Sequence, residues 1–146
     1  NFKLTTGTRV TVGPVRINLL AALSPYLSDA LIAGENRDFL GVLAWPNVDA
    51  CKAHLDGGGE GVAIEDIVSN ESLREKIREC LARYNNLNSG SSVRVQRVLL
   101  LTEPPSFDGN EITDKGYINQ SAGLQRRASL VQALFAEPPG GEVIVA

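Results

Sequence analysis

The first fifteen residues carry a short alternation of apolar and polar side chains. Val10 and Val12 alternate with threonine and arginine, and Gly7 stands where a tight turn would reverse the chain, so the pattern predicts a β-hairpin. Two continuous apolar runs follow, over residues 29–34 and 40–45, and a polar turn separates them. Short apolar runs bounded by turn residues are typical of buried strands, and these two predict a second hairpin.

Other stretches repeat their apolar residues with the period of a helix. Residues 15–23 predict a short helix that Pro14 opens, because the first helical position needs no N–H group. The strongest pattern covers residues 70–84, where Asn70 is a good N-cap and apolar side chains recur every three or four positions. A final helix is predicted from about residue 119 or 121 to residue 135.

The remaining patterns complete a small α+β domain. Residues 93–101 alternate at first and end in an apolar run, which predicts a third strand, and residues 48–55 can form a helix. We therefore expect two layers, with an N-terminal β-hairpin plus a short, mainly three-stranded sheet flanked by helices. Along the chain this gives a hairpin (1–14), a main domain (15–136) and a tail (137–146), whose residues 142–146 are either a loose end or an edge strand.

Composition and charge narrow the classes of function. The 14 Lys and Arg residues are outnumbered by 17 Asp and Glu residues, and this balance argues against a nucleic-acid surface. No apolar run approaches the roughly 20 residues that span a bilayer, and the N-terminus lacks the plan of a signal peptide, so we expect no membrane contact and a cytoplasmic protein. Cys51 and Cys80 are expected to be buried thiols, and with His54 as the one histidine no metal site is expected.

Lys115 is the main candidate for chemistry. It lies between a stretch rich in proline and glycine and the start of the final helix, which predicts an exposed turn. Gly116 beside it permits a backbone bend that most residues could not adopt. A lysine so placed is a mobile point charge that can reach a phosphate or carboxylate delivered from elsewhere. From composition alone, a solvated surface lysine is the favoured interpretation.

Three segments resemble, in collinear order, the C-terminal lid domain of acyl-adenylate-forming enzymes. Residues 111–120 (EITDKGYINQ), followed by Gln125-Arg126-Arg127, are similar to the lysine loop of that lid, in the form found in feruloyl-CoA synthetases. Residues 2–10 (FKLTTGTRV) resemble its first β-loop, and residues 29–43 (DALIAGENRDFLGVL) resemble its first strands, joined by a Gly-x-x-Arg-Asp turn. Asp114 stands where most of the superfamily has glycine.

The resemblance implies an acid–CoA ligase that uses ATP, Mg²⁺ and CoA, none of them held tightly by this chain. Lys115 would contact the substrate carboxylate and the α-phosphate, and Gly7, Thr8 and Arg9 would line the tunnel for CoA. The implied partner is a large N-terminal adenylating domain of the same chain. The implied substrate is an aromatic, hydroxycinnamic acid, as in aromatic acid degradation, although the acid pocket would belong to that other domain.

A stand-alone α+β binding or interaction module without catalysis is the alternative. Several other features have ordinary interpretations beside functional ones. Glu111 and Asp114 either orient the lysine loop or lie on a solvated turn, and Trp45 is either a core aromatic or a ligand-stacking one. The glycines of residues 57–61 form either a plain loop or a phosphate cradle that lacks its usual flanking strand and helix. His54 has no identifiable partner nucleophile.

Overall fold

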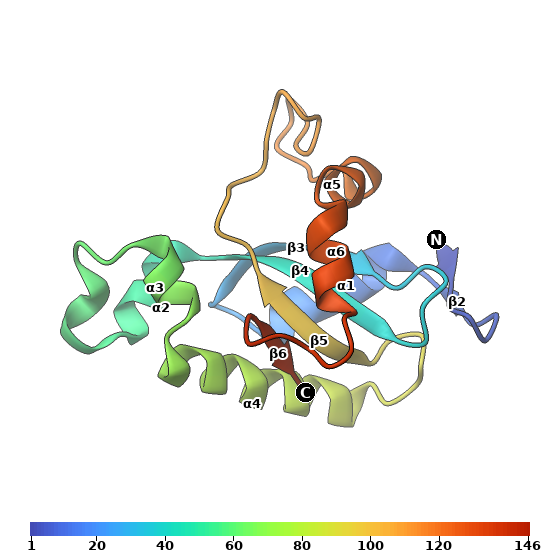
Figure 1. The fold of residues 1–146 in the computed structure, drawn as a ribbon, viewed down its shortest axis with the longest axis horizontal. Coiled ribbons are helices and arrows are strands. Elements are labelled where there is room, and N and C mark those ends of the chain that lie inside the picture. The colour runs from blue at the N-terminus through green and yellow to red at the C-terminus, as the bar shows by residue number, and fades with distance from the viewer.

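A four-stranded sheet forms the centre of the protein in the computed structural model, which describes residues 1–146 (Figure 1). The strand order is β3–β4–β5–β6, and β4 is antiparallel to β3 but parallel to β5, which pairs in turn with antiparallel β6. The second hairpin and the third strand are thus confirmed, and of the two alternatives for the C-terminus the structure shows the edge strand. The bounds are β3 Leu27–Ala33, β4 Leu40–Pro46, β5 Val95–Leu100 and β6 Val143–Val145.

The N-terminal hairpin is also confirmed. Strands β1 (Phe2–Lys3) and β2 (Arg9–Val10) pair in antiparallel register, and Gly7 has a φ of 85° in the turn between them.

Helix α1 (Val12–Ala22) begins earlier than the sequence predicted. Pro14 is its third residue and not its first, and the N-cap is Thr11. Proline is tolerated there because the N–H groups of the whole first turn lack an intrahelical partner.

Four helices cover one face of the sheet. They are α1, α2 (Val48–His54), α3 (Ile64–Val68) and α4 (Glu71–Leu87), and α2 to α4 form the crossover that the parallel pair β4–β5 requires. The predicted cap of α4 is confirmed, since Asn70 Oδ1 accepts a hydrogen bond from the Leu73 N–H group at 2.9 Å. A cluster of 22 buried residues fills this side of the molecule. Helix α3 and the short 3₁₀ turn Asp56–Gly59 were not predicted, because five residues or fewer give no readable period.

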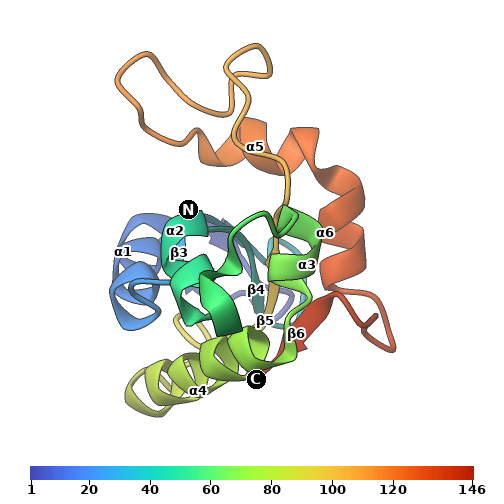
Figure 2. The ribbon, with the colours of Figure 1, turned by 90° about the vertical axis from the view of Figure 1, so that its left-hand side faces the viewer.

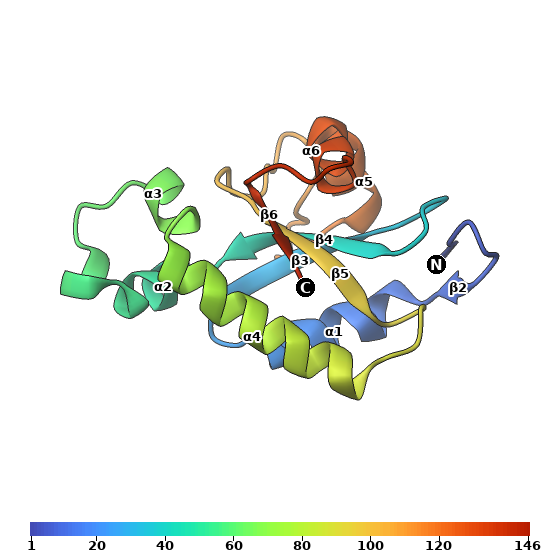
Figure 3. The same cartoon turned by 60° about the horizontal axis from the view of Figure 1, so that its bottom comes forward.

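Two further helices, α5 (Gln120–Arg126) and α6 (Ala128–Leu134), cover the opposite face (Figure 3). The prediction of one continuous final helix is wrong, since the backbone departs from helical geometry at Arg127 (φ −106°, ψ 32°). The side chain of Arg127 is buried and hydrogen-bonds to Glu111 and to the carbonyl oxygens of Glu103 and Pro104, in the loop before α5. The helix bends at this residue. The α+β class, with its hairpin and a sheet flanked by helices, is confirmed, and the structure adds a fourth strand and helices on both faces.

Candidate functional site

Residues 102–119 form an arch that rises from the sheet between β5 and α5 (Figures 1 and 2), and Lys115 belongs to the turn of residues 112–118 within it. A single bridge between Ile112 and Ile118 closes this turn into a miniature hairpin. Within it, the Thr113 N–H group donates to Tyr117 O at 2.8 Å and the Gly116 N–H group donates to Thr113 O at 2.8 Å. Lys115 is therefore exposed on a hydrogen-bonded turn, as the sequence predicted.

Gly116 has a φ of 83°, in the left-handed region. No atom lies within 4 Å of the position that a Cβ would take there, so backbone conformation and not crowding favours glycine. The turn presents the lysine side chain to solvent with no neighbouring bulk.

The base of the arch is a buried ion pair that the sequence did not reveal. Glu111 is 0% exposed and Arg127 is 4% exposed, so the solvated-turn interpretation is wrong for Glu111, whereas Asp114 is exposed. The Glu111 carboxylate accepts hydrogen bonds from Arg127 Nε at 2.7 Å, from Arg127 Nη2 at 3.1 Å and from the Ser106 N–H group at 3.0 Å. An arginine in a helical pattern gives no sign of such burial, because most arginines of that kind are solvated.

Burial by itself would raise the pKa of Glu111, since it disfavours the charged form. The hydrogen bonds from Arg127 and the Ser106 N–H group, with the charges of Arg127 and Arg126, outweigh burial and hold the pKa below its ordinary value. Glu111 is therefore a structural carboxylate at neutral pH and not a proton donor.

Gly7, Thr8 and Arg9 lie at the turn and second strand of the N-terminal hairpin, and no hydrogen bond or salt bridge joins them to the arch. Figure 1 places this hairpin and the arch in different parts of the molecule. Its anchor is the turn between β3 and β4: the Thr5 N–H group donates to Arg37 O at 2.9 Å, and Thr5 Oγ1 donates to Asp38 Oδ1 at 2.6 Å. The two candidate loops thus belong to two separate surfaces.

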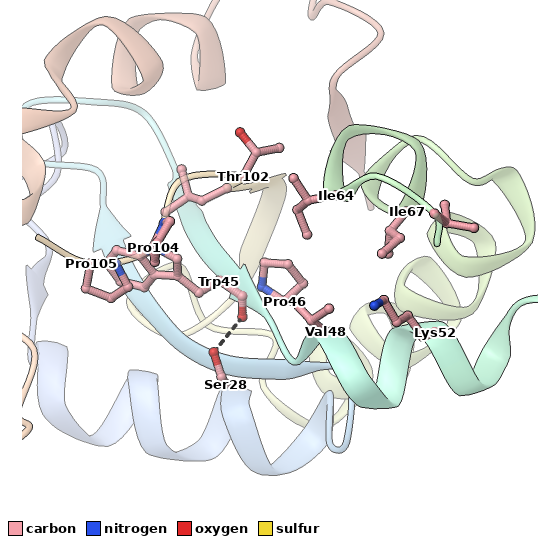
Figure 4. A pocket seen from close by; sticks show the side chains of 12 residues that line it. Ser28, Trp45, Pro46, Val48, Lys52, Ile64, Ile67, Thr102, Pro104 and Pro105 are labelled. Carbon is pink, nitrogen blue, oxygen red and sulfur yellow. Dashed lines mark hydrogen bonds between the residues drawn. The ribbon is translucent and has the colours of Figure 1, made fainter. Parts of the chain in front are cut away.

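A cleft of about 390 Å³ opens beside Trp45, between the end of β4, helices α2 and α3, and the first residues of the arch (Figure 4). Trp45 is 4% exposed, and its Nε1 donates to Glu103 O at 2.9 Å. Lys52 is the one charged residue of the lining, and no titratable pair accompanies it. The core interpretation of Trp45 is favoured, and the cleft offers surface for binding without groups for acid–base chemistry.

The other candidates show no catalytic geometry. His54 Nε2 lies 3.1 Å from Ser72 Oγ, but Ser72 is exposed and no carboxylate hydrogen-bonds to the histidine ring. Cys51 and Cys80 are buried free thiols, as expected. The glycine loop of residues 57–61 follows helix α2 and does not follow a strand, which favours a plain loop.

No helix combines the length and apolar character that crossing a bilayer takes. No three His, Cys, Asp or Glu side chains cluster in a way that could hold a metal ion, so we assign no metal ligand to this chain.

The sequence of this chain is that of a known domain family. The chain belongs to the AMP-binding enzyme C-terminal domain family, whose sequence profile matches residues 2–138. No curated protein matches the chain at the sequence level.

Solved structures with a similar fold include two from Segniliparus rugosus, each with a TM-score of 0.68 and 17% identity over 93% of this chain. One is the A domain of carboxylic acid reductase in complex with AMP and a co-purified carboxylic acid, and the other is the A-PCP didomain of that reductase in complex with AMP. The adenylation domain of a carboxylate reductase from Mycobacterium chelonae gives a TM-score of 0.68 at 16% identity over 92% of this chain. At these identities the likeness concerns the fold alone. This chain covers 20%, 17% and 19% of those three chains.

Proposed function

We propose that the chain is the mobile C-terminal domain of an ATP-dependent acid–CoA ligase similar to feruloyl-CoA synthetase, and that Lys115 acts in carboxylate adenylation. The observation that carries the proposal is the exposed Lys115, at the tip of a hydrogen-bonded turn, in a chain of the AMP-binding enzyme C-terminal domain family. A similar fold occurs in a domain solved with AMP and a carboxylic acid, which are the two halves of an acyl-adenylate.

In the first half-reaction, an oxygen of the substrate carboxylate attacks the α-phosphorus of ATP. The new O–P bond replaces the bond from that phosphorus to the bridging oxygen, and pyrophosphate leaves. Mg²⁺ bound with the ATP would supply further positive charge to the phosphates. The Lys115 ammonium group would hold the carboxylate near the α-phosphate and offset the negative charge that builds up between them. Positive charge on a flexible stem suits this role because the charge must approach oxygens brought by another domain.

In the second half-reaction, the thiol sulfur of CoA attacks the acyl carbonyl carbon. A C–S bond forms, the C–O bond to AMP breaks, and the thiol proton passes to solvent. The turn around Gly7 would line the pantetheine tunnel, because a glycine allows close approach of the backbone to a ligand. Thr8 and Arg9 would be its neighbours. The separation of this turn from the lysine arch supports a rotation of the domain between the two steps.

The proposed partner is a large N-terminal adenylating domain that brings the ATP and acid pockets. The arch exposes two large apolar side chains, those of Phe107 and Tyr117, and Tyr117 is two residues from Lys115 in the sequence. Aromatic side chains are enriched where one protein surface meets another. Because the chain resembles the lid domain of feruloyl-CoA synthetases, the proposed substrate class is a hydroxycinnamic acid.

The test is a comparison of half-reactions in the enzyme that contains this domain. Lys115→Ala should lower acid-dependent ATP–pyrophosphate exchange by about 10²- to 10³-fold, since a charge that acts in the transition state is lost. Thioester formation from preformed acyl-adenylate should stay near the wild-type rate. Lys76→Ala, on the far helix α4, is the matched control and should change neither rate.

Equal loss in both half-reactions would count against the role given to Lys115. If neither rate changed, Lys115 would have no part in catalysis, and the proposed role would fail. The thiol that accepts the acyl group is tested separately, by supplying CoA to the enzyme with preformed acyl-adenylate. Thioester formation with another thiol carrier and not with CoA would contradict the CoA ligase assignment.

A further inference from the structure

A pair of charged side chains beneath the arch has no part in the proposed chemistry. Glu111 is 0% exposed and Arg127 is 4% exposed, and charged residues are seldom buried to this extent. Neither side chain hydrogen-bonds to residues 112–118, the turn on which Lys115 lies exposed. Their burial therefore needs a reason other than contact with a substrate.

Arg127 joins segments that are far apart in the sequence. Its Nη2 donates to Glu103 O at 2.9 Å and to Pro104 O at 3.2 Å, at the start of the arch. Its guanidinium group lies 5.2 Å from the centre of the Trp45 ring, at the end of β4. Its own backbone is the junction between α5 and α6. One side chain thus fixes the arch to the sheet and to the two helices behind it.

Glu111 fastens the two ends of the lysine turn. Its N–H group donates to Ser106 O at 2.9 Å, and its carboxylate accepts from the Ser106 N–H group at 3.0 Å. Its carbonyl oxygen accepts from the Asn119 N–H group at 2.8 Å, one residue beyond the bridge between Ile112 and Ile118. The first strand of the miniature hairpin begins directly after Glu111, and the residue that follows the second strand is hydrogen-bonded to Glu111. This one buried residue therefore holds both strands at their base.

We infer that Glu111 and Arg127 are positioning residues, which set the direction in which the arch presents Lys115. A two-stranded turn of this size is marginal in water by itself, so its orientation must come from its base. Stability alone would not require charges there, because replacing both members of a buried ion pair by apolar residues is often neutral or stabilising. A bidentate arginine–carboxylate pair adds fixed geometry. This inference rests on the proposed role of Lys115.

The test separates positioning from stability by comparing three variants of this chain. Arg127→Met leaves the buried Glu111 carboxylate without its arginine hydrogen bonds, with only Arg126 Nη1 at 3.7 Å as a counter-charge, so the thermal midpoint of this variant should fall. The double variant Glu111→Leu with Arg127→Met has no buried charge, and its midpoint should return toward the wild-type value. Arg97→Met is the matched control: Arg97 is 7% exposed and donates to Leu134 O and Ala136 O, away from the arch.

The first readout is the order of the turn, measured by ¹⁵N relaxation of residues 112–118. In the double variant the backbone order parameters should fall from about 0.85 to below about 0.6, although the fold is kept. In Arg97→Met they should stay at the wild-type values even if the midpoint falls. A double variant with a rigid turn would overturn the inference, because a pair with a purely stabilising role leaves the turn unchanged.

The second readout is activity in the enzyme that contains this domain. The double variant should lose about 10- to 100-fold in kcat for adenylation, since misplacement of about 1 Å is enough for such losses. Its rate of thioester formation from preformed acyl-adenylate should be unchanged. Wild-type adenylation in a double variant with a disordered turn would overturn the inference. If Lys115→Ala kept full adenylation, the proposed function would fail instead, and the order parameters would still decide whether the pair fixes the turn.

Discussion

Glu111 and Cys51 are both fully buried, yet their pKa values move in opposite directions. Burial disfavours the charged form of each group. The Glu111 carboxylate receives hydrogen bonds and positive charge from Arg127, which stabilise the anion. The Cys51 thiol meets only the carbonyl oxygen of Tyr26, at 3.4 Å, and this acceptor does nothing for a thiolate. Burial therefore raises the pKa of Cys51 to about 11.

The lowered pKa of Glu111 predicts that the free energy of unfolding falls at acidic pH. Because the folded pKa lies below the ordinary value of 4.5, the carboxylate stabilises the fold above that pH, and this contribution is lost as pH falls through the folded pKa. Urea unfolding at pH 6, 4.5 and 3.5 should show a steeper loss of free energy for the wild type than for Glu111→Gln. Glu79→Gln, at an exposed position of α4, should follow the wild type, and parallel curves for all three would contradict the prediction.

The raised pKa of Cys51 predicts a loss of folding stability at alkaline pH. The unfolded chain releases the thiol proton near pH 9.0 and the folded chain near 11, so stability falls as pH rises through this window. The loss should be on the order of 2 kcal/mol by pH 11. Burial raises the pKa of Tyr84 too, and adds a loss of the same sign. Cys51→Ala should flatten the curve between pH 9 and 11, and an unchanged slope would argue against the raised thiol pKa.

At the residue scale, the sequence predicted features that depend on neighbouring residues and missed a contact between residues far apart in the chain. The exposure of Lys115 and the bend at Gly116 depend on a few neighbouring residues, and both are found in the structure. The Glu111–Arg127 pair joins residues 16 positions apart through tertiary packing. Periodicity has no means of signalling that contact, because it records one element at a time.

At the scale of elements, the edge of the sheet at β3 is covered in an unusual way. Gln120 Oε1 accepts from the Ile32 N–H group at 3.0 Å, and Gln120 Nε2 donates to Ile32 O. The amide side chain thus replaces one residue of a neighbouring strand and joins the start of α5 to the sheet. Polar groups of an exposed strand edge otherwise invite pairing with other chains.

Gln120→Ala should therefore destabilise the domain more than a surface substitution does. Two backbone groups of Ile32 lose their partner, which costs about 1–3 kcal/mol where they are shielded from water. Gln125→Ala, at an exposed position of the same helix, should stay within about 0.5 kcal/mol of the wild type. Urea unfolding at neutral pH measures both, and equal values would show that the Gln120 contact contributes nothing.

The elements themselves were predictable in proportion to their length and period. Helix α4 has 17 residues, a clear apolar stripe and the Asn70 cap, and its position follows from these signals. Helix α3 has five residues, and α5 and α6 were merged, because the stripe that they share continues across Arg127 while the backbone does not. The break comes from a side chain drawn under the arch, and only the folded structure supplies that contact.

At the scale of the whole molecule, the domain presents its candidate groups outward. Lys115 and Gly7 are exposed on different surfaces, and neither lines the cleft beside Trp45. We expect the 146-residue chain to fold cooperatively but to catalyse neither half-reaction by itself. Acid-dependent ATP–pyrophosphate exchange measured on the purified chain should stay at the background level, and a clear signal there would contradict the division of the active site between two domains.

The two sides of the sheet are buried unequally, with 22 core residues beneath α1 and α4 and nine beneath α5 and α6. Segments with fewer buried apolar contacts open at lower free energy than the rest of a protein. The amides of α5 and α6 should therefore exchange with solvent before those of α4. Since the lysine arch is tied to these two helices, warming the enzyme should abolish adenylation at a temperature where most of the domain is still folded.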